Sequence, residues 1–384
     1  MQEQRLKVGI VGLGEIAQII HLPILMQMSD RYEIVALCDI SKQLLHYIGK
    51  HYRVKHLYTD IHEMAAQEDI DVIFVLNSNE YHTESVIAAI NNHKHVFVEK
   101  PMCFTLREAD EIIEARDAAG VQVMVGYMRR FAPAFLRGVE EVKQLGHINY
   151  ARIRDIIGQN AFFIDQIAQA ARFNDIPASA RADRAERFEA MMKEATGTDS
   201  PQIHSIYNTL CGLNGHDFSA MREMLGFPHQ VLSAAQGPGQ FLTAIFEFDG
   251  YNATFETGID HQGRFDASLE VFGETRTIRV QYNTPYIRHL PTRLFVAQTV
   301  GEKYTETEVR PSYTDPYTLE LEYLYDSLTG DQQPKTTPED FKEDLLLNQM
   351  ILDELKYTQG KAQTRKKILS SVPGLSAQRK EESA

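Results

Sequence analysis

The chain has 384 residues, of which 43% are hydrophobic and 24% charged, as is ordinary for a soluble globular protein of two or three domains. Its net charge of −14 argues against a nucleic-acid partner, because binding to phosphates needs a basic surface. No basic-then-apolar leader precedes the first apolar run, and no run reaches membrane-spanning length, so we expect a cytoplasmic protein without membrane contact. Cys38, Cys103 and Cys211 lack CxxC spacing and are expected to be reduced thiols.

The most informative motif lies near the start of the chain. An apolar run ending at Val11 passes into Gly12-x-Gly14-x-x-Ala17 and then into a helical pattern. This order predicts a buried strand, a tight turn and a helix whose first amides face a bound pyrophosphate. The next strand, 33–38, is followed by Asp39, near the spacing at which a carboxylate meets ribose hydroxyls. The competing interpretation is a strand, turn and helix that bind no nucleotide.

Strands and helices alternate as far as residue 127. After Asp39 we expect, in order, a helix near 41–51, a strand at 56–58, a helix at 60–67, a strand at 71–76, a helix at 80–92, a strand at 95–101, a helix at 106–119 and a strand at 121–127. This alternation predicts right-handed crossovers and a parallel, doubly wound sheet.

The pattern changes after residue 128. A helix at 132–145 precedes a strand that begins near Asn149, and residues 159–200 show helical patterns only. That segment is long enough to cover the nucleotide crevice as a lid, or it packs at the periphery. Three hairpins follow, with turns at 249–250, 273–274 and 301–302, and they predict an antiparallel sheet. Because the solvent face of this sheet carries Thr, Tyr and Phe besides charges, we hypothesise that a partner subunit covers it.

A final helix is expected to begin at Thr337-Pro338, run to about Thr358 and stop at Gly360. We therefore predict an α/β fold in three parts: a dinucleotide-binding domain at 1–127, an α+β domain for substrate binding and oligomerisation at 128–375, and a disordered tail at 376–384.

Polar residues follow several of the predicted parallel strands, where such sheets bind ligands. Lys100 directly follows an apolar strand, an unusual place for a residue that is normally solvated. A partly desolvated ammonium there can hydrogen-bond a substrate hydroxyl and help remove its proton, while the alternative is a strand-end lysine paired with Glu99 or phosphate. The histidines show no metal-ligand set, so no metal is expected.

These motifs resemble those of the Gfo/Idh/MocA family of glucose–fructose oxidoreductases and inositol dehydrogenases. The resemblance rests on the glycine turn, Asp39, His82, Glu99-Lys100-Pro101 and the Gly126–Phe131 stretch, and it is clear over about residues 6–135. It implies a Rossmann domain followed by a mostly antiparallel sheet domain, NAD(P)-dependent oxidation or reduction of sugars and cyclitols, and oligomers built through the sheets. It also implies that Lys100 contacts the reacting hydroxyl.

The second motif of that family places an Asp four residues before a His that opens a helix. Here His216 matches the histidine, but Gly212 occupies the Asp position. The His–Asp partnership is then either replaced, with Asp217, Asp165 or Asn214 as candidates, or absent. A histidine at a helix start is expected to be neutral and able to accept a proton, although it can also simply satisfy backbone groups.

The candidate residues fall into three sets. The catalytic pair is Lys100 and His216. The cofactor set is Gly12, Gly14, Glu15, Ile16, Ala17, Asp39, Asn77, Ser78, Asn79, His82, Glu99, Lys100 and Arg129. The substrate set is Lys100, Tyr127, Asp165, Asn214, His216 and Asp217.

The leading hypothesis is an NAD(P)-dependent dehydrogenase or reductase of a secondary alcohol or ketone in a sugar, glycoside or cyclitol, acting as a homodimer or homotetramer. Asp39 favours NAD, although Ser41 and Lys42 leave NADP open. The first alternative is an NAD-dependent glycoside lyase or hydrolase that works through a transient keto-sugar without net redox change. The second is a non-catalytic nucleotide-binding regulator.

Overall fold

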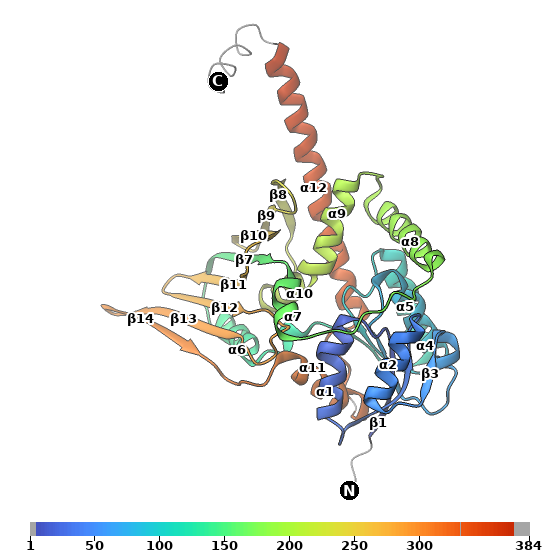
Figure 1. Ribbon diagram of the computed structural model, residues 1–384. Coiled ribbons are helices and arrows are strands. Elements are labelled where there is room, and N and C mark those ends of the chain that lie inside the picture. The colour runs from blue at the N-terminus through green and yellow to red at the C-terminus, as the bar shows by residue number, and fades with distance from the viewer. Residues whose placement is uncertain (1–4, 331, 372–384) are drawn as a thin grey trace.

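The computed structural model describes residues 5–330 and 332–371 and contains two β-sheets (Figure 1). The tail expected at 376–384 lies outside the described residues. The first sheet has the order β3-β2-β1-β4-β5-β6, and all of its strand pairs are parallel. Its strands are β1 (Leu6–Val11), β2 (Tyr32–Cys38), β3 (His56–Tyr58), β4 (Val72–Val75), β5 (His95–Glu99) and β6 (Val123–Gly126). The predicted parallel, doubly wound sheet is thus confirmed.

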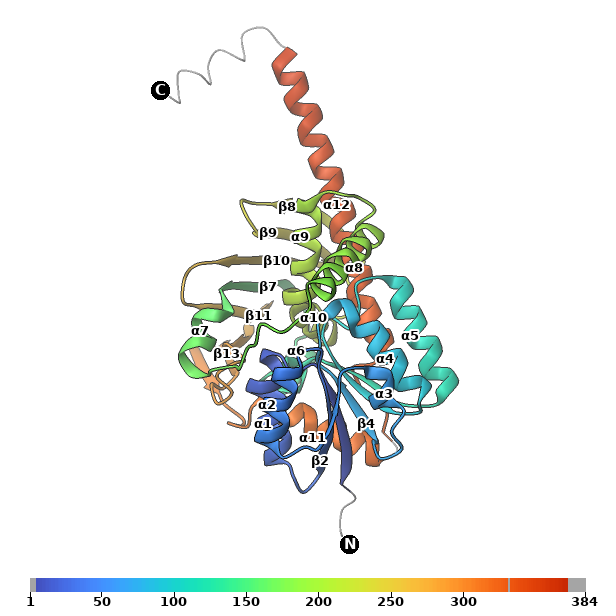
Figure 2. The same ribbon diagram turned by 45° about the vertical axis from the view of Figure 1, so that its right-hand side comes forward.

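Short helices connect these strands and cover the sheet (Figure 2). They are α1 (Leu22–Gln27), preceded by a π-helical turn (Ala17–His21), then α2 (Lys42–Tyr52), α3 (Ile61–Ala65), α4 (His82–Asn91) and α5 (Leu106–Ala119). Their ends follow local rules. Ser41 caps α2 by accepting from the Leu44 amide, and Thr105 with Glu108 forms a capping box at α5, which ends at the left-handed Gly120.

The second sheet has the order β14-β13-β12-β11-β7-β10-β9-β8, and it is antiparallel except where β7 pairs with β10. The three predicted hairpins are present. The strands are β7 (Ile148–Gly158), β8 (Gln230–Gln236), β9 (Leu242–Phe248), β10 (Tyr251–Asp260), β11 (Phe265–Gly273), β12 (Arg276–Tyr282), β13 (Arg293–Val300) and β14 (Lys303–Val309).

The two faces of this second sheet differ. Phe246 and Phe255 on one face are buried against Phe218 of α10. The other face carries cross-strand ion pairs, in which Arg154 binds Glu256 and Asp266, each at 2.8 Å. Figure 1 shows the strands of this sheet extending away from the parallel sheet.

The remaining helices are α6 (Pro133–Lys143), α7 (Asn160–Ile167), α8 (Ala178–Thr196), α9 (Pro201–Thr209), α10 (Gly215–Leu225), α11 (Pro316–Thr329) and α12 (Pro338–Ser371). A π-helical turn, Leu210–Asn214, joins α9 to α10. The sequence analysis did not anticipate α11. This helix packs on the first sheet, where the hydroxyl of Tyr32 donates to the carbonyl of Leu321 at 2.6 Å.

The expected stop of the last helix at Gly360 is wrong, because α12 continues through it to Ser371. A single glycine inside a helix costs only about 1 kcal/mol relative to alanine, and the flanking Gln, Lys and Ala residues favour the helix. Figures 1 and 2 both show α12 (red) projecting well beyond the two sheets. Within residues 5–330 and 332–371, no helix combines the length and apolar character needed to cross a bilayer.

Candidate active site

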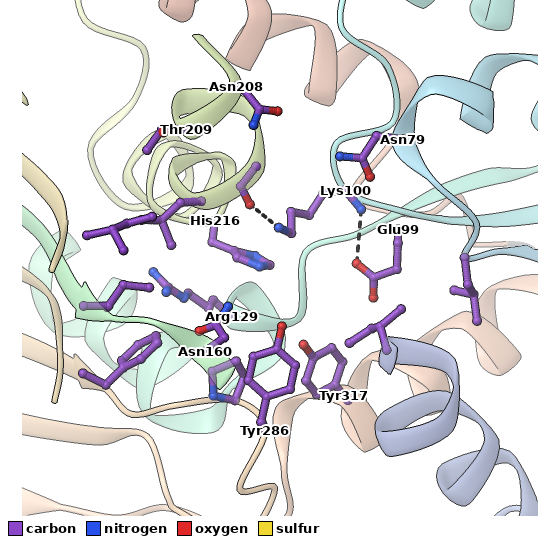
Figure 3. A pocket seen from close by; sticks show the side chains of 18 of the residues that line it. Asn79, Glu99, Lys100, Arg129, Asn160, Asn208, Thr209, His216, Tyr286 and Tyr317 are labelled. Atoms are coloured by element: carbon purple, nitrogen blue, oxygen red, sulfur yellow. Dashed lines mark hydrogen bonds between the residues drawn. The ribbon is translucent and has the colours of Figure 1, made fainter. Parts of the chain in front are cut away.

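A cavity of about 360 Å³ lies at the carboxyl ends of β4 and β5, between the two sheets. Figure 3 shows side chains from both sides of the molecule converging on it. Residues from the predicted sets that line it are Ile16, Asn77, Asn79, His82, Glu99, Lys100, Arg129 and His216. Asn77 and Asn79 follow β4, and Lys100 follows β5. The parallel sheet therefore brings these polar strand-end residues together at the cavity.

Lys100 directly follows β5 and points its ammonium group across the cavity (Figure 3). The ammonium donates a hydrogen bond to the carbonyl oxygen of Gly212, in the π-helical turn. Burial lowers the pKa of Lys100, although the Glu99 carboxylate opposes that effect. The side chain of Glu99 instead contacts His21 Nε2 at 2.8 Å and accepts from the Lys100 backbone amide at 3.2 Å. The ammonium therefore faces the cavity without being held by a side-chain carboxylate.

His216 is the second residue of α10, and its ring lies in the cavity close to Lys100 and Arg129 (Figure 3). Burial, followed by the charges of these two neighbours, lowers the pKa of His216 well below its usual value. Its Nδ1 atom is buried and has no hydrogen-bond partner among the described residues. The imidazole is therefore neutral at physiological pH and able to accept a proton.

None of the three expected replacements for the missing aspartate is hydrogen-bonded to this ring. Asp217 is bound to Arg129 at 2.6 Å, and the Asn214 amide donates to Asp217 at 3.1 Å and to Thr257 at 2.9 Å. Asp165 is exposed on α7 and lies outside the residues that line the cavity. Within the part of the chain that the structure describes, the His216 ring therefore has no carboxylate hydrogen-bonded to Nδ1.

Arg129 lines the cavity but is held between two buried carboxylates, Asp217 at 2.6 Å and Asp155 of β7 at 2.9 Å. Burial raises the pKa of Asp217, and the neighbouring Asp155 adds to the effect. This cluster joins the end of the parallel sheet to β7 and α10. The positive charge of Arg129 is thus largely compensated within the protein and not left free for a phosphate.

Four residues expected to touch substrate lie elsewhere. Tyr127 is fully buried, and its hydroxyl donates to Asp344 of α12. Asn214 and Asp217 are buried in the Arg129 cluster, and Asp165 is on the surface of α7, so none of the four lines the cavity. The sequence placed Tyr127 correctly at a strand end, but it gave no sign that α12 would cover its ring.

The glycine turn and Asp39 follow β1 and β2, so they lie at the same carboxyl edge of the parallel sheet as Lys100. Gly12 has φ of +87°, and a Cβ there would lie 2.3 Å from the Asn77 amide nitrogen, so Gly12 is required by packing between β1 and β4. A Cβ at Gly14 would meet nothing within 4 Å, which leaves open space beside the turn. Asp39 accepts from the amides of Leu13 and Ser41, each at 2.8 Å. An open glycine next to a strand-end carboxylate fits a dinucleotide at this edge.

The other members of the cofactor set have varied surroundings. The ring nitrogens of His82 lie 2.8 Å from the Pro101 carbonyl oxygen and 3.0 Å from the Asn77 carbonyl oxygen. Burial lowers the pKa of His82 and so favours the neutral ring, which donates to one of these two carbonyls. This ring fixes the loops after β4 and β5 in position. Glu15 pairs with Arg172 at 2.6 Å, whereas Ala17 is buried and Ser78 half-buried, and all three lie outside the cavity lining.

Sequence reasoning missed several polar residues of the cavity: Asn160, Asn208, Thr209, Gln240, Tyr286 and Tyr317. Asn208 and Thr209 were detectable, because they stand four and three residues before Gly212 and share a helical face with it. Tyr286 lies outside the regular elements, where no periodic pattern points to it. Among the described residues, no group of three or more His, Cys, Asp or Glu side chains is placed to hold a metal ion.

The geometry defines a class: a two-sheet α/β protein with an open glycine turn and a strand-end carboxylate at one edge of its parallel sheet, and a lysine-containing cavity beside them. Residues 6–127 match the family model described as an oxidoreductase family with an NAD-binding Rossmann fold, Gfo/Idh/MocA. Residues 6–127 are thus the Rossmann domain of that oxidoreductase family, and the chain is a dehydrogenase or reductase that acts on CH–OH groups.

Curated relatives and solved structures agree with this assignment. The chain is 24% identical to inositol 2-dehydrogenase of Salmonella typhimurium over 343 residues, which cover 86% of this chain and 88% of that protein. It is 33% identical to myo-inositol 2-dehydrogenase of Thermotoga maritima over 138 residues, or 36% and 41% of the two chains. The crystal structure of levoglucosan dehydrogenase with NADH and levoglucosan shares the fold, with a TM-score of 0.72 at 17% identity over 92% of this chain and 98% of that one.

Proposed function

We propose that this protein is an NAD-preferring dehydrogenase or reductase of a secondary alcohol or ketone in a sugar, glycoside or cyclitol. The observation that carries the proposal is the position of Lys100, whose ammonium faces the cavity opposite the neutral ring of His216 (Figure 3). The cavity wall supports a polyol substrate, because the amides of Asn160 and Asn208 and the hydroxyl of Tyr286 can bind several hydroxyl groups.

In the oxidation direction, a substrate hydroxyl lies between the two catalytic groups. The Lys100 ammonium donates a hydrogen bond to the hydroxyl oxygen and stabilises negative charge that develops there, and His216 accepts the hydroxyl proton. A bound nicotinamide supplies the hydride acceptor for the carbon. In the reverse direction, protonated His216 returns the proton to the carbonyl oxygen. Both groups act in a buried site, where electrostatic interactions are less screened than in water.

The preference for NAD is supported by Asp39. Its carboxylate, fixed by two backbone amides, can accept the two adenosine ribose hydroxyls and repels a phosphate at the 2′ position. Similar proteins are inositol 2-dehydrogenase and levoglucosan dehydrogenase, whose crystal structure contains NADH and levoglucosan. These similarities support the substrate class and leave the individual substrate to experiment.

The test is incubation of the purified protein with NAD⁺ or NADP⁺ and a panel of cyclitols, free sugars and glycosides, with the absorbance of reduced cofactor as the readout. We expect stoichiometric formation of NADH with at least one member of the panel. Release of aglycone from a glycoside without accumulation of NADH would replace the proposal with the lyase alternative. If calorimetry detects no nucleotide binding, the proposal fails.

We also propose that the chain forms a homodimer or homotetramer through the second sheet. The ion-paired face of β7, β10 and β11 supports this, because cross-strand pairs such as Arg154 with Glu256 and Asp266 hold charged side chains in place on that face, where a partner subunit can contact them. Light scattering during gel filtration measures the oligomer mass, and a monomer at micromolar concentration would overturn the proposal.

A further inference from the structure

The segment 168–177 connects α7 to α8 and crosses the carboxyl edge of the parallel sheet (Figures 1 and 2). It is attached there at several points. The side chain of Gln18 exchanges two hydrogen bonds with the backbone of Ala171, at 2.8 and 3.1 Å. Arg172 pairs with Glu15 at 2.6 Å, and the ring of Phe173 lies 5.9 Å from that of Tyr47. The segment is therefore held on the helices that follow β1 and β2.

Asp175 is the last anchor of this segment, and it lies at the start of α2. One carboxylate oxygen accepts from the Ser41 hydroxyl, and the other accepts from the Gln43 amide at 2.9 Å. These two bonds hold the pKa of Asp175 below its usual value, so the group is ionised at neutral pH. On the opposite side of Ser41, the backbone amide donates to Asp39 at 2.8 Å. Ser41 thus lies between two carboxylates.

The residues that follow β2 lie where the two nicotinamide dinucleotides would differ, because NADP carries a phosphate at the 2′ position of the adenosine ribose and NAD carries a hydroxyl. A carboxylate at the end of β2 binds the adenosine ribose, so a 2′-phosphate on that ribose would extend toward the residues that follow β2. A phosphate needs hydrogen-bond donors, and the Ser41 hydroxyl and Gln43 amide are the neutral donors at the start of α2. Both already donate to Asp175.

We propose that Asp175 is a second determinant of cofactor specificity, which excludes the 2′-phosphate of NADP by occupying its donors and by adding a negative charge beside Asp39. The inference rests on the proposed dinucleotide site and adds to it a residue from a distant segment. Lys42, next to Ser41, is the cation that would attract the phosphate, and Asp175 opposes it. NAD, which has only a hydroxyl at the 2′ position, leaves these contacts intact.

The test is calorimetric binding of NAD⁺ and NADP⁺ to the wild type and to Asp175→Asn and Asp175→Ser. We expect the wild type to prefer NAD⁺. Asp175→Ser should bind NADP⁺ roughly tenfold more tightly than the wild type does, with NAD⁺ affinity changed less than about twofold, since removing a like charge beside a ligand chiefly improves binding of the charged competitor. Asp175→Asn keeps an acceptor for the Gln43 amide, so it tests the charge without loosening the segment.

Two controls separate specificity from anchoring. Asp199→Asn removes an exposed acid, paired with Lys193, at the other end of the 19-residue α8, and should leave both affinities unchanged. Phe173→Ala loosens the segment without changing its charge, because it removes the ring contact with Tyr47, and should change NAD⁺ and NADP⁺ affinity by the same factor. If both Asp175 variants also shift the two affinities equally, or leave NADP⁺ affinity unchanged, the inference is overturned. If the wild type binds neither nucleotide, the proposed function itself fails.

Discussion

The ammonium of Lys100 donates its hydrogen bond to the carbonyl oxygen of Gly212, the residue that stands where the family pattern has an aspartate. A backbone carbonyl holds the ammonium in place without neutralising its charge, as a carboxylate would. The same glycine accounts for the lack of a partner on His216 Nδ1 among the described residues, because the side chain that would carry the carboxylate is absent at position 212. One small residue thus alters the surroundings of both proposed catalytic groups.

Replacement of Gly212 with alanine should raise stability and weaken substrate binding. A Cβ there meets nothing within 4 Å, and glycine in a helix costs about 1 kcal/mol relative to alanine, so the free energy of unfolding should rise by up to that amount. Because Gly212 lines the cavity, the methyl group should raise KM for a substrate that fills it. Denaturant unfolding and steady-state kinetics measure the two effects.

Gly360→Ala is the matched control, since a Cβ at Gly360 of α12 also meets nothing within 4 Å. It should stabilise the protein similarly and leave KM unchanged. An unchanged KM in Gly212→Ala would show that the space beside residue 212 lies outside the substrate site.

Replacement of Lys100 with methionine should reduce kcat by roughly 10²- to 10⁴-fold, the usual contribution of a group that assists proton transfer. Methionine keeps the length of the side chain, so the fold and the affinity for nucleotide should change little. Lys143→Met is the control, because Lys143 is exposed on α6 and pairs with Glu140 of the same helix. Equal kcat in the two variants would remove Lys100 from the mechanism.

The rate should depend on pH through both groups. Oxidation needs a neutral His216, whose pKa lies well below its usual 6.5. As the pH falls, kcat/KM should therefore stay constant through pH 6.5 and decline only at a clearly lower pH. It also needs a charged Lys100, whose pKa is lowered from 10.5, so the alkaline decline should begin before pH 10.5. A pH series of kcat/KM measures both limbs.

Two variants assign those limbs. His216→Gln should lower the rate and abolish the acid limb, and Lys100→Arg should move the alkaline limb to higher pH, because an arginine remains charged. An acid limb that persists in His216→Gln belongs to another group.

The sequence located the residues that follow regular strands. Gly12, Asp39 and Lys100 each stand just after an apolar strand, and the parallel sheet gathers such positions at one edge, so the lining of the cavity by Lys100 followed from local patterns. The partners of these residues were not predictable in the same way. Asp155 binds Arg129 across 26 residues, and Asp175 binds Ser41 across 134, and no periodic pattern reports such contacts.

The same limit explains why the sequence did not indicate that Tyr127 lies away from the cavity lining. Tyr127 is separated by 217 residues from Asp344, the carboxylate that accepts its hydrogen bond, and α12 packs against β6 and β8 only in the folded chain. The end of α12 failed for a different reason. A glycine predicts a helix end only when the residues beyond it favour one, and those beyond Gly360 favour helix.

The buried cluster of Arg129, Asp155 and Asp217 should be a major determinant of stability. Replacing Arg129 with methionine leaves two buried carboxylates without a counter-charge, a change that typically costs roughly 3–5 kcal/mol. Arg107→Met is the control, because Arg107 is exposed on α5 and its pairs with Glu111 and Glu194 should contribute about 1 kcal/mol or less. Urea unfolding of the two variants should differ accordingly. Equal losses would mean that the buried pairs of Arg129 contribute no more to stability than the exposed pairs of Arg107 do.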